Sequence, residues 1–268
     1  LLSKRSKSEY CDLLCRHEGV AVVPVTLELS NLPPLFTSEF CKELSRTLAA
    51  RSNEMVHVNA REEMVLLSQQ VGNLSVPQGH RLFAITNCIR VALQHAVVLY
   101  SGPDHAHSWA DVSFQIDRNQ VRPGNREQTV ADFVIYSWLQ AMSEKKPLLL
   151  DEGVHTPDHP FVRRYASGEK VDLNALVKAN LRWVDSSKNW GVRVADMAAN
   201  IVYEAVRDLD DRNGAISTYA NLMRSSLLEP QKGPGLLTMS DEGAADEVAA
   251  KYQLLHDKRK EFGHKFAV

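Results

Sequence analysis

Apolar residues recur at every third or fourth position over most of the chain, a spacing typical of amphipathic helices. This spacing predicts helices over residues 6–18, 37–51, 61–70, 81–100, 127–142, 191–209 and 211–228, with a charged helical tail after a Pro- and Gly-rich linker at 230–235. Strands are predicted at 20–29, where β-branched residues dominate, at 111–117, where apolar and polar residues alternate, and at 180–185. Residues 143–170 are rich in Pro, His and charge, and they predict a loop.

The apolar faces of these elements indicate which residues should be buried. Along the strand at 111–117, Val112, Phe114 and Ile116 share one face and polar residues share the other. In the helices, the predicted buried positions include Tyr10, Leu13, Leu14 and Cys15 over 6–18, Val130, Phe133, Val134, Trp138 and Leu139 over 127–142, and Val194, Met197, Ala198, Ile201, Val202 and Ala205 over 191–209.

Strands that alternate with helices predict an α/β fold, in which helices pack on a mixed sheet. Three strands are few for a sheet that must cover this many helices, and the chain opens at Leu1 without an initiator Met. We therefore expect further strands to precede Leu1. The expected organisation is an α/β domain over residues 1–210, followed by a helical extension over 211–268.

The composition is that of an average globular protein, with 44% hydrophobic and 24% charged residues, and it excludes collagen, coiled coil and wholesale disorder. The formal net charge of −2 predicts no general attraction to nucleic acid or membranes, so that any basic surface must be local. No stretch reaches the roughly 18 apolar residues of a membrane span, and no secretory signal is visible. Four cysteines without a Cys-x-x-Cys motif predict reduced thiols in a cytoplasmic protein. The lack of an apolar span and the charge balance predict no membrane association.

The richest candidate chemistry lies in residues 183–207. Asp185 ends the last predicted strand, and Asp196 follows in the next helix among apolar neighbours, where a carboxylate is costly to bury. Two such carboxylates can converge on one hard cation, since Mg²⁺ takes oxygen ligands. The alternatives are structural: Asp196 pairs with Arg193 or caps a neighbouring backbone, and Asp185 or Ser186 caps the helix.

This region resembles the C-terminal signature of the family catalogued as domain of unknown function 3800. That signature is a strand, Asp-Ser, a short turn, Gly, and a helix that contains Ala-Asp. The matching residues here are Asp185-Ser186, Gly191 and Ala195-Asp196. The strand at 111–117, which ends in Asp117, is similar to the family's central strand, and residues 7–29 are similar to its middle. The resemblance thus covers residues 6–207.

The resemblance implies a ribonuclease-H-like fold, a mixed sheet flanked by helices, here with extra C-terminal helices. Proteins of that fold commonly hold two divalent ions, one generating a nucleophilic water and the other stabilising the leaving oxygen of a phosphodiester. A metal-dependent nuclease or phosphodiesterase is therefore expected, with Mg²⁺ or Mn²⁺ as cofactor and nucleic acid as a partner. The matching acids are Asp117, Asp185 and Asp196. Basic residues that either hold substrate phosphates or form a solvated face are Arg118, Arg122, Lys188 and Arg193.

The chain departs from the family at its first strand, which normally ends in Asp-Glu-Ser-Gly. No such strand lies near this N-terminus, and the Asp151-Glu152 pair comes too late in chain order to replace it. A second hypothesis is therefore a catalytically incomplete ribonuclease-H-like module that binds a protein or nucleic-acid partner. Either hypothesis requires the strands that end in Asp117 and Asp185 to be neighbours; otherwise the resemblance is accidental.

Two groups of His and Asp side chains offer zinc-ligand types. They are Asp104, His105 and His107, and His155, Asp158 and His159. Histidines in polar loops are more often solvated than bound to zinc, which favours the structural interpretation here. The chain contains no Gly-rich loop of P-loop spacing and no Gly-x-Ser-x-Gly motif.

Overall fold

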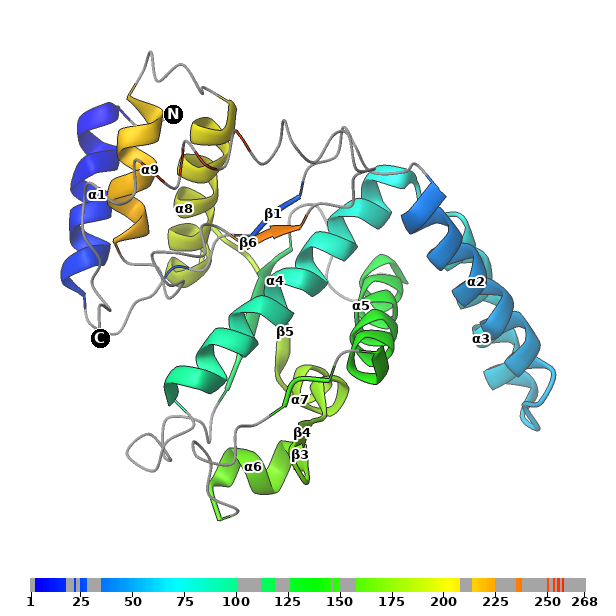
Figure 1. Ribbon diagram of the computed structural model, residues 1–268. Helices are drawn as coiled ribbons and strands as arrows, with labels where there is room; N and C mark the ends of the chain where they lie inside the picture. The colour runs from blue at the N-terminus through cyan, green and yellow to red at the C-terminus, as the bar shows by residue number, and fades with distance from the viewer. Residues whose placement is uncertain are drawn as a thin grey trace. The chain divides into compact units, whose positions relative to one another are not determined.

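The computed structural model describes residues 3–17, 22, 25–27, 35–100, 112–118, 126–145, 147–149, 158–207, 214–224, 235–237, 250, 253, 255 and 257. The helices in this part of the chain are α1 (Lys4–Arg16), α2 (Leu35–Ser52), α3 (Val58–Gly72), α4 (Val76–Tyr100), α5 (Arg126–Lys145), α6 (Pro160–Tyr165), α7 (Leu173–Asn180), α8 (Trp190–Arg207) and α9 (Ala215–Met223) (Figure 1). The strands are β1 (Val25–Leu27), β2 (Phe114–Asp117), β3 (Ala166–Ser167), β4 (Lys170–Val171), β5 (Leu181–Val184) and β6 (Gly235–Leu237).

These elements form two units, which we describe separately. The first unit combines Leu1–Leu32 with Ser186–Val268, and the second comprises Pro33–Asp185. This division differs from the expected boundary at residue 210, because after Asp185 the chain returns to the unit that it began at its N-terminus.

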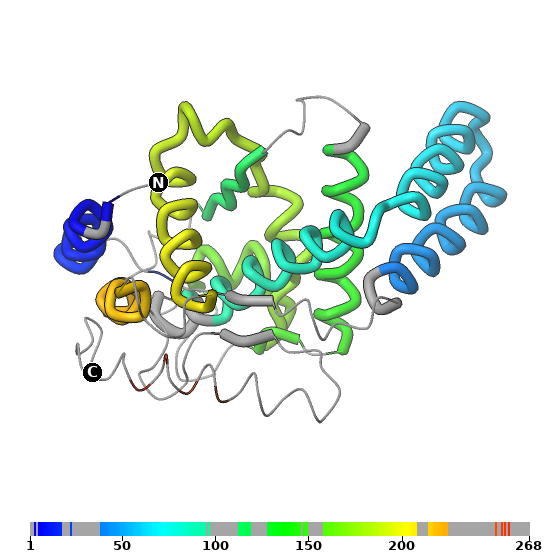
Figure 2. The backbone as a smooth tube through the Cα atoms, turned by 90° about the horizontal axis from the view of Figure 1, so that it is seen from above, coloured from blue at the N-terminus to red at the C-terminus, as the bar shows by residue number. Residues whose placement is uncertain are grey.

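Three helices of the first unit, α1, α8 and α9, lie side by side around one apolar core (Figures 1 and 2). The stripe predicted along α8 is confirmed for Ala198, Ile201, Val202 and Ala205, while Val194 and Met197 are half-buried. On α1 the buried residues are Tyr10, Cys11 and Leu14, whereas Leu13, predicted to be buried, is 54% exposed. Successive residues of an α-helix are about 100° apart. Leu13 therefore points well away from the face that the other three share.

Helix α9 is buried over nearly its whole surface, since eight of its nine residues are buried. Its two buried polar side chains are hydrogen-bonded. Thr218 Oγ1 donates to Gly214 O at 2.9 Å, and Asn221 Nδ2 donates to Asp12 Oδ1 at 3.2 Å. The chain after residue 210 thus supplies a core helix of the first unit and not only a peripheral extension.

Helices α2 and α3 form a helical hairpin in the second unit (Figures 1 and 2). Small residues allow the two helices to approach closely. Ser68 Oγ donates to Ser45 O at 2.9 Å, and a Cβ atom added to Gly72 would lie 2.9 Å from Ser45 Oγ. A larger residue at position 72 would therefore require the Ser45 side chain to shift.

Aromatic side chains join this hairpin to α4 and α5. The ring of Trp138 stacks on Phe40 with centroids 4.2 Å apart, and it contacts Phe83 at 4.7 Å. Trp138 is only 4% exposed. Along α5 the predicted buried stripe is confirmed for Val130, Val134, Trp138 and Leu139, while Phe133 is half-buried.

The described strands pair into three two-stranded sheets. β2 pairs with β5 and β1 with β6, both in parallel, and β3 pairs with β4 in antiparallel orientation. Helices and parallel strands together agree with the expected α/β class. The described residues contain no larger mixed sheet of the kind that the ribonuclease-H-like prediction requires.

The prediction of a loop over 143–170 is wrong in its described part. Helix α5 continues to Lys145, α6 follows at Pro160–Tyr165, and β3 and β4 form a tight hairpin in which Gly168 has a φ of 61°. Helix α6 has six residues, too few to show a helical period. Helix α7 and strand β6 were missed for the same reason, because both are short.

Candidate functional site

The strands that end in Asp117 and Asp185 are neighbours, as the resemblance requires. In the parallel pair of β2 and β5, Asp117 lies opposite Val184. The ladder continues by one further bond, in which Arg118 N donates to Val184 O at 2.9 Å. Because the strands are parallel, their carboxyl ends meet at one edge. Asp117 and Asp185 therefore lie at the same end of this small sheet.

Arg118 shares this edge with the two acids. Its Nη2 lies 3.6 Å from Asp185 Oδ2, and both side chains are partly exposed, 26% for Arg118 and 37% for Asp185. An ion pair with this exposure contributes at most about 1 kcal/mol. A phosphate that binds Arg118, or a cation that binds Asp185, therefore loses little free energy by breaking this ion pair.

Asp132 is a further acid near this sheet that the sequence analysis did not single out. Its Oδ1 accepts a hydrogen bond from Trp183 Nε1 at 2.6 Å, which ties α5 to β5. Burial raises the pKa of the Asp132 carboxyl, and the hydrogen bond from Trp183 opposes that rise. Burial and the charge of Asp132 together raise the pKa of Tyr136 to about 12. The sequence signal that could have found Asp132 is its place between Val130 and Phe133, two predicted buried positions of the helix over 127–142.

Asp196 belongs to the first unit, on α8, and it is exposed. The expectation that it lies in a costly apolar environment is therefore wrong. The buried face of α8 carries Ala198 and Val202, and the 100° spacing places Asp196 on the opposite side of the helix. The helix begins with a different cap from those expected, since Asn189 Oδ1 accepts from Val192 N at 3.0 Å.

The predicted phosphate-binding residues are divided between the two units. Arg118 lies in the second unit beside Asp185, whereas Lys188 and Arg193 are exposed in the first unit. Arg122 falls outside the described residues. Of the three described residues, Arg118 is the one that shares a unit with Asp117 and Asp185.

The one described histidine of the two predicted zinc groups has a structural role. His159 is 2% exposed, and its Nδ1 accepts from Phe161 N at 3.2 Å as the N-cap of α6. Asp158 is described and exposed, whereas 104–107 and His155 lie outside the described residues. Within the described part of the chain, no group of three or more His, Cys, Asp or Glu side chains could hold a metal ion.

Comparisons of the chain with protein families, curated proteins and solved structures found no match. The resemblance to the domain of unknown function 3800 family therefore remains a prediction. In the described residues we find no helix whose length and apolar character suit a membrane span.

Proposed function

We propose that this chain is a metal-dependent phosphodiesterase or nuclease with a ribonuclease-H-like fold. The observation that carries the proposal is that Asp117 and Asp185 both lie at the carboxyl ends of two adjacent parallel strands. The two acids are far apart in the sequence, and the pairing of β2 with β5 brings them to the same end of one sheet. Asp196 enters the proposal only through the family resemblance, since it lies in the other unit.

The proposal includes a single Mg²⁺ or Mn²⁺ ion, which is supported by the type of residue present at this end of the sheet. Mg²⁺ is commonly bound by one or two carboxylates together with water and substrate phosphate. Asp117 and Asp185 would hold the ion, and Arg118 would hold a non-bridging phosphate oxygen through its guanidinium. A bound ion supplies Lewis-acid stabilisation of the charge that develops on the phosphoryl group. A two-ion centre would need further acids besides these two.

The expected location of the protein, the cytoplasm, is part of the same proposal. All four cysteines, Cys11, Cys15, Cys41 and Cys88, are free thiols in the structure. Free thiols are typical of a reducing compartment.

The test is cleavage of labelled single-stranded and duplex DNA and RNA by the full chain with Mg²⁺ or Mn²⁺, and with EDTA. Asp117→Asn and Asp185→Asn should each lower the rate on the order of 10²-fold or more, as removal of a group that stabilises developing charge does. Asp158→Asn is the matched control, because Asp158 is an exposed acid of the same unit that belongs to neither strand. A metal-dependent activity that survives both site substitutions unchanged refutes the assignment of the site.

A second candidate function is a catalytically incomplete module that binds nucleic acid or a protein. The ion pair of Arg118 with Asp185 favours it, because that pair already neutralises one of the two acids. Anisotropy of a labelled oligonucleotide in EDTA separates the two functions. Binding without metal that falls in Arg118→Ala, with no cleavage when metal is added, supports the module.

A further inference from the structure

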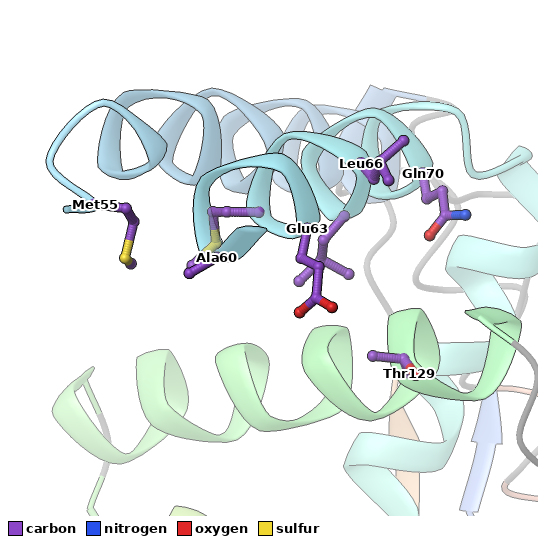
Figure 3. Close-up of a pocket in the computed structure, with 8 residues that line it drawn as sticks. Met55, Ala60, Glu63, Leu66, Gln70 and Thr129 are labelled. Carbon is purple, nitrogen blue, oxygen red and sulfur yellow. The ribbon is translucent and has the colours of Figure 1, made fainter. Parts of the chain in front are cut away.

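A cleft of about 420 Å³ lies between α3 and the N-terminal half of α5 in the second unit (Figure 3). Its wall on the α3 side is mainly apolar, formed by Met55, Ala60, Met64, Leu66 and Leu67. Thr129 lines it from α5. Methionine side chains are flexible and polarizable, so they adapt to apolar partners of different shape. The cleft is separate from the edge of the sheet that carries Asp117 and Asp185.

One exposed apolar side chain, Leu66, belongs to the wall of this cleft. Of the nine large hydrophobic residues that are exposed in the described chain, five lie between positions 56 and 76. Val56 is 88% exposed and Val58 is 62% exposed, and Leu66 is 37% exposed on the wall of the cleft itself. Leu66 therefore presents apolar surface at the cleft wall that a bound partner would cover.

Among the described side chains that line the cleft, the charged one is Glu63. Figure 3 shows the Glu63 carboxylate directed into the space between α3 and α5, and Glu63 forms no hydrogen bond or ion pair among the described residues. Glu62 is its exposed neighbour. The only basic residue of α3 is Arg61, whose guanidinium donates to Met55 O at 2.9 Å. The carboxylate of Glu63 in the cleft disfavours nucleic acid and anionic lipid, and it disfavours a second copy that would bring the same carboxylate opposite.

We propose that this cleft binds an amphipathic, basic helix of a partner protein. The apolar wall extends from Ala60 to Leu67, about 10 Å along the axis of α3, which corresponds to two turns of a bound helix. Such a helix would insert apolar side chains at i and i+3 or i+4 between Met64 and Leu66, and it would place a Lys or Arg against Glu63. The inference does not rest on the nuclease proposal.

The test uses the full chain and a fluorescein-labelled amphipathic peptide of Leu, Ala and Lys, about 18 residues long so that it can form a helix. A second peptide replaces every Lys with Glu. We expect anisotropy to show binding of the Lys peptide in preference to the Glu peptide. In Glu63→Lys the affinity for the Lys peptide should fall about fivefold or more, since an exposed ion pair contributes up to about 1 kcal/mol. The matched control Glu62→Lys should change it by less than twofold.

The apolar wall is tested in the same assay with a second matched pair. Leu66→Ser should weaken binding about fivefold, because a partly exposed leucine gains burial in the complex. Val58→Ser, on the same helix but outside the cleft, should leave binding unchanged. Circular dichroism should show that all four variants keep the helix content of the parent chain. Three outcomes would overturn the proposal. The first is that a substitution and its matched control change binding equally, the second is that both peptides bind equally, and the third is that the Lys peptide does not bind.

Discussion

Trp138 should hold the α2–α3 hairpin to the rest of the second unit, and Trp138→Leu tests this directly. The substitution removes two ring contacts, to Phe40 at 4.2 Å and to Phe83 at 4.7 Å. Each aromatic pair contributes about 0.5–1.5 kcal/mol beyond the burial of its area. Leucine also leaves part of the indole volume empty, which adds a cavity cost. Together these losses should lower the free energy of unfolding by about 2–4 kcal/mol.

The assay should resolve the two units, because a chain with two units need not unfold in one transition. Urea unfolding followed by circular dichroism gives the overall loss, and hydrogen exchange read by mass spectrometry assigns it to segments. Peptides from α2 and α5 should lose protection, whereas those from α9 should not. Trp190→Leu is the matched control, since Trp190 is 64% exposed and its replacement should change stability by less than about 0.5 kcal/mol.

Two outcomes would contradict this expectation. The first is a loss of stability in Trp138→Leu no larger than in Trp190→Leu, which would mean that the stacked rings contribute little. The second is an equal loss of protection in α9 and in α2, which would mean that the effect is not local to the contact between Trp138 and Phe40.

Two further predictions concern helix caps. Burial lowers the pKa of His159, whose Nδ1 accepts from Phe161 N. The contribution of His159 to the free energy of unfolding should therefore be constant above pH 6.5, the ordinary pKa of histidine, and fall as the pH decreases below it. His159→Asn keeps a capping oxygen but cannot titrate, so urea unfolding across this range should show a smaller fall. Asn189→Ala should cost about 1 kcal/mol because it removes the acceptor for Val192 N, while Asn189→Asp should preserve the stability of α8.

Long helices with a regular apolar period were predictable from their own residues. The expected helices over 81–100 and 191–209 correspond to α4 and α8, because each carries enough turns for its buried stripe to stand out. Helices α6 and α7 have six and eight residues, and each depends on a capping side chain, His159 or Asp172. Elements of this length are stabilised by their tertiary contacts more than by local preference. Their existence could not be read from periodicity.

The candidate site, like the fold, could be predicted from the sequence only in part. The alternation of apolar and polar residues predicted strand β2, and the acid at its end pointed to Asp117. Local sequence does not determine which strand pairs with β2. The pairing of β2 with β5 joins segments more than 60 residues apart, and it decides that Asp117 and Asp185 share an edge. The approach of Arg118 to Asp185 and the bond from Trp183 to Asp132 depend on the same packing.

The sequence alone thus determined the positions of the long helices, the β-branched and alternating segments that form strands, and the residue types available for chemistry. The tertiary structure decided which of these segments meet. It placed α9 in the core of the first unit with α1, left Asp196 on the exposed side of α8, and formed the cleft between α3 and α5. The physical reason is that periodicity is a property of neighbouring residues, whereas burial and contact depend on partners that are distant along the chain.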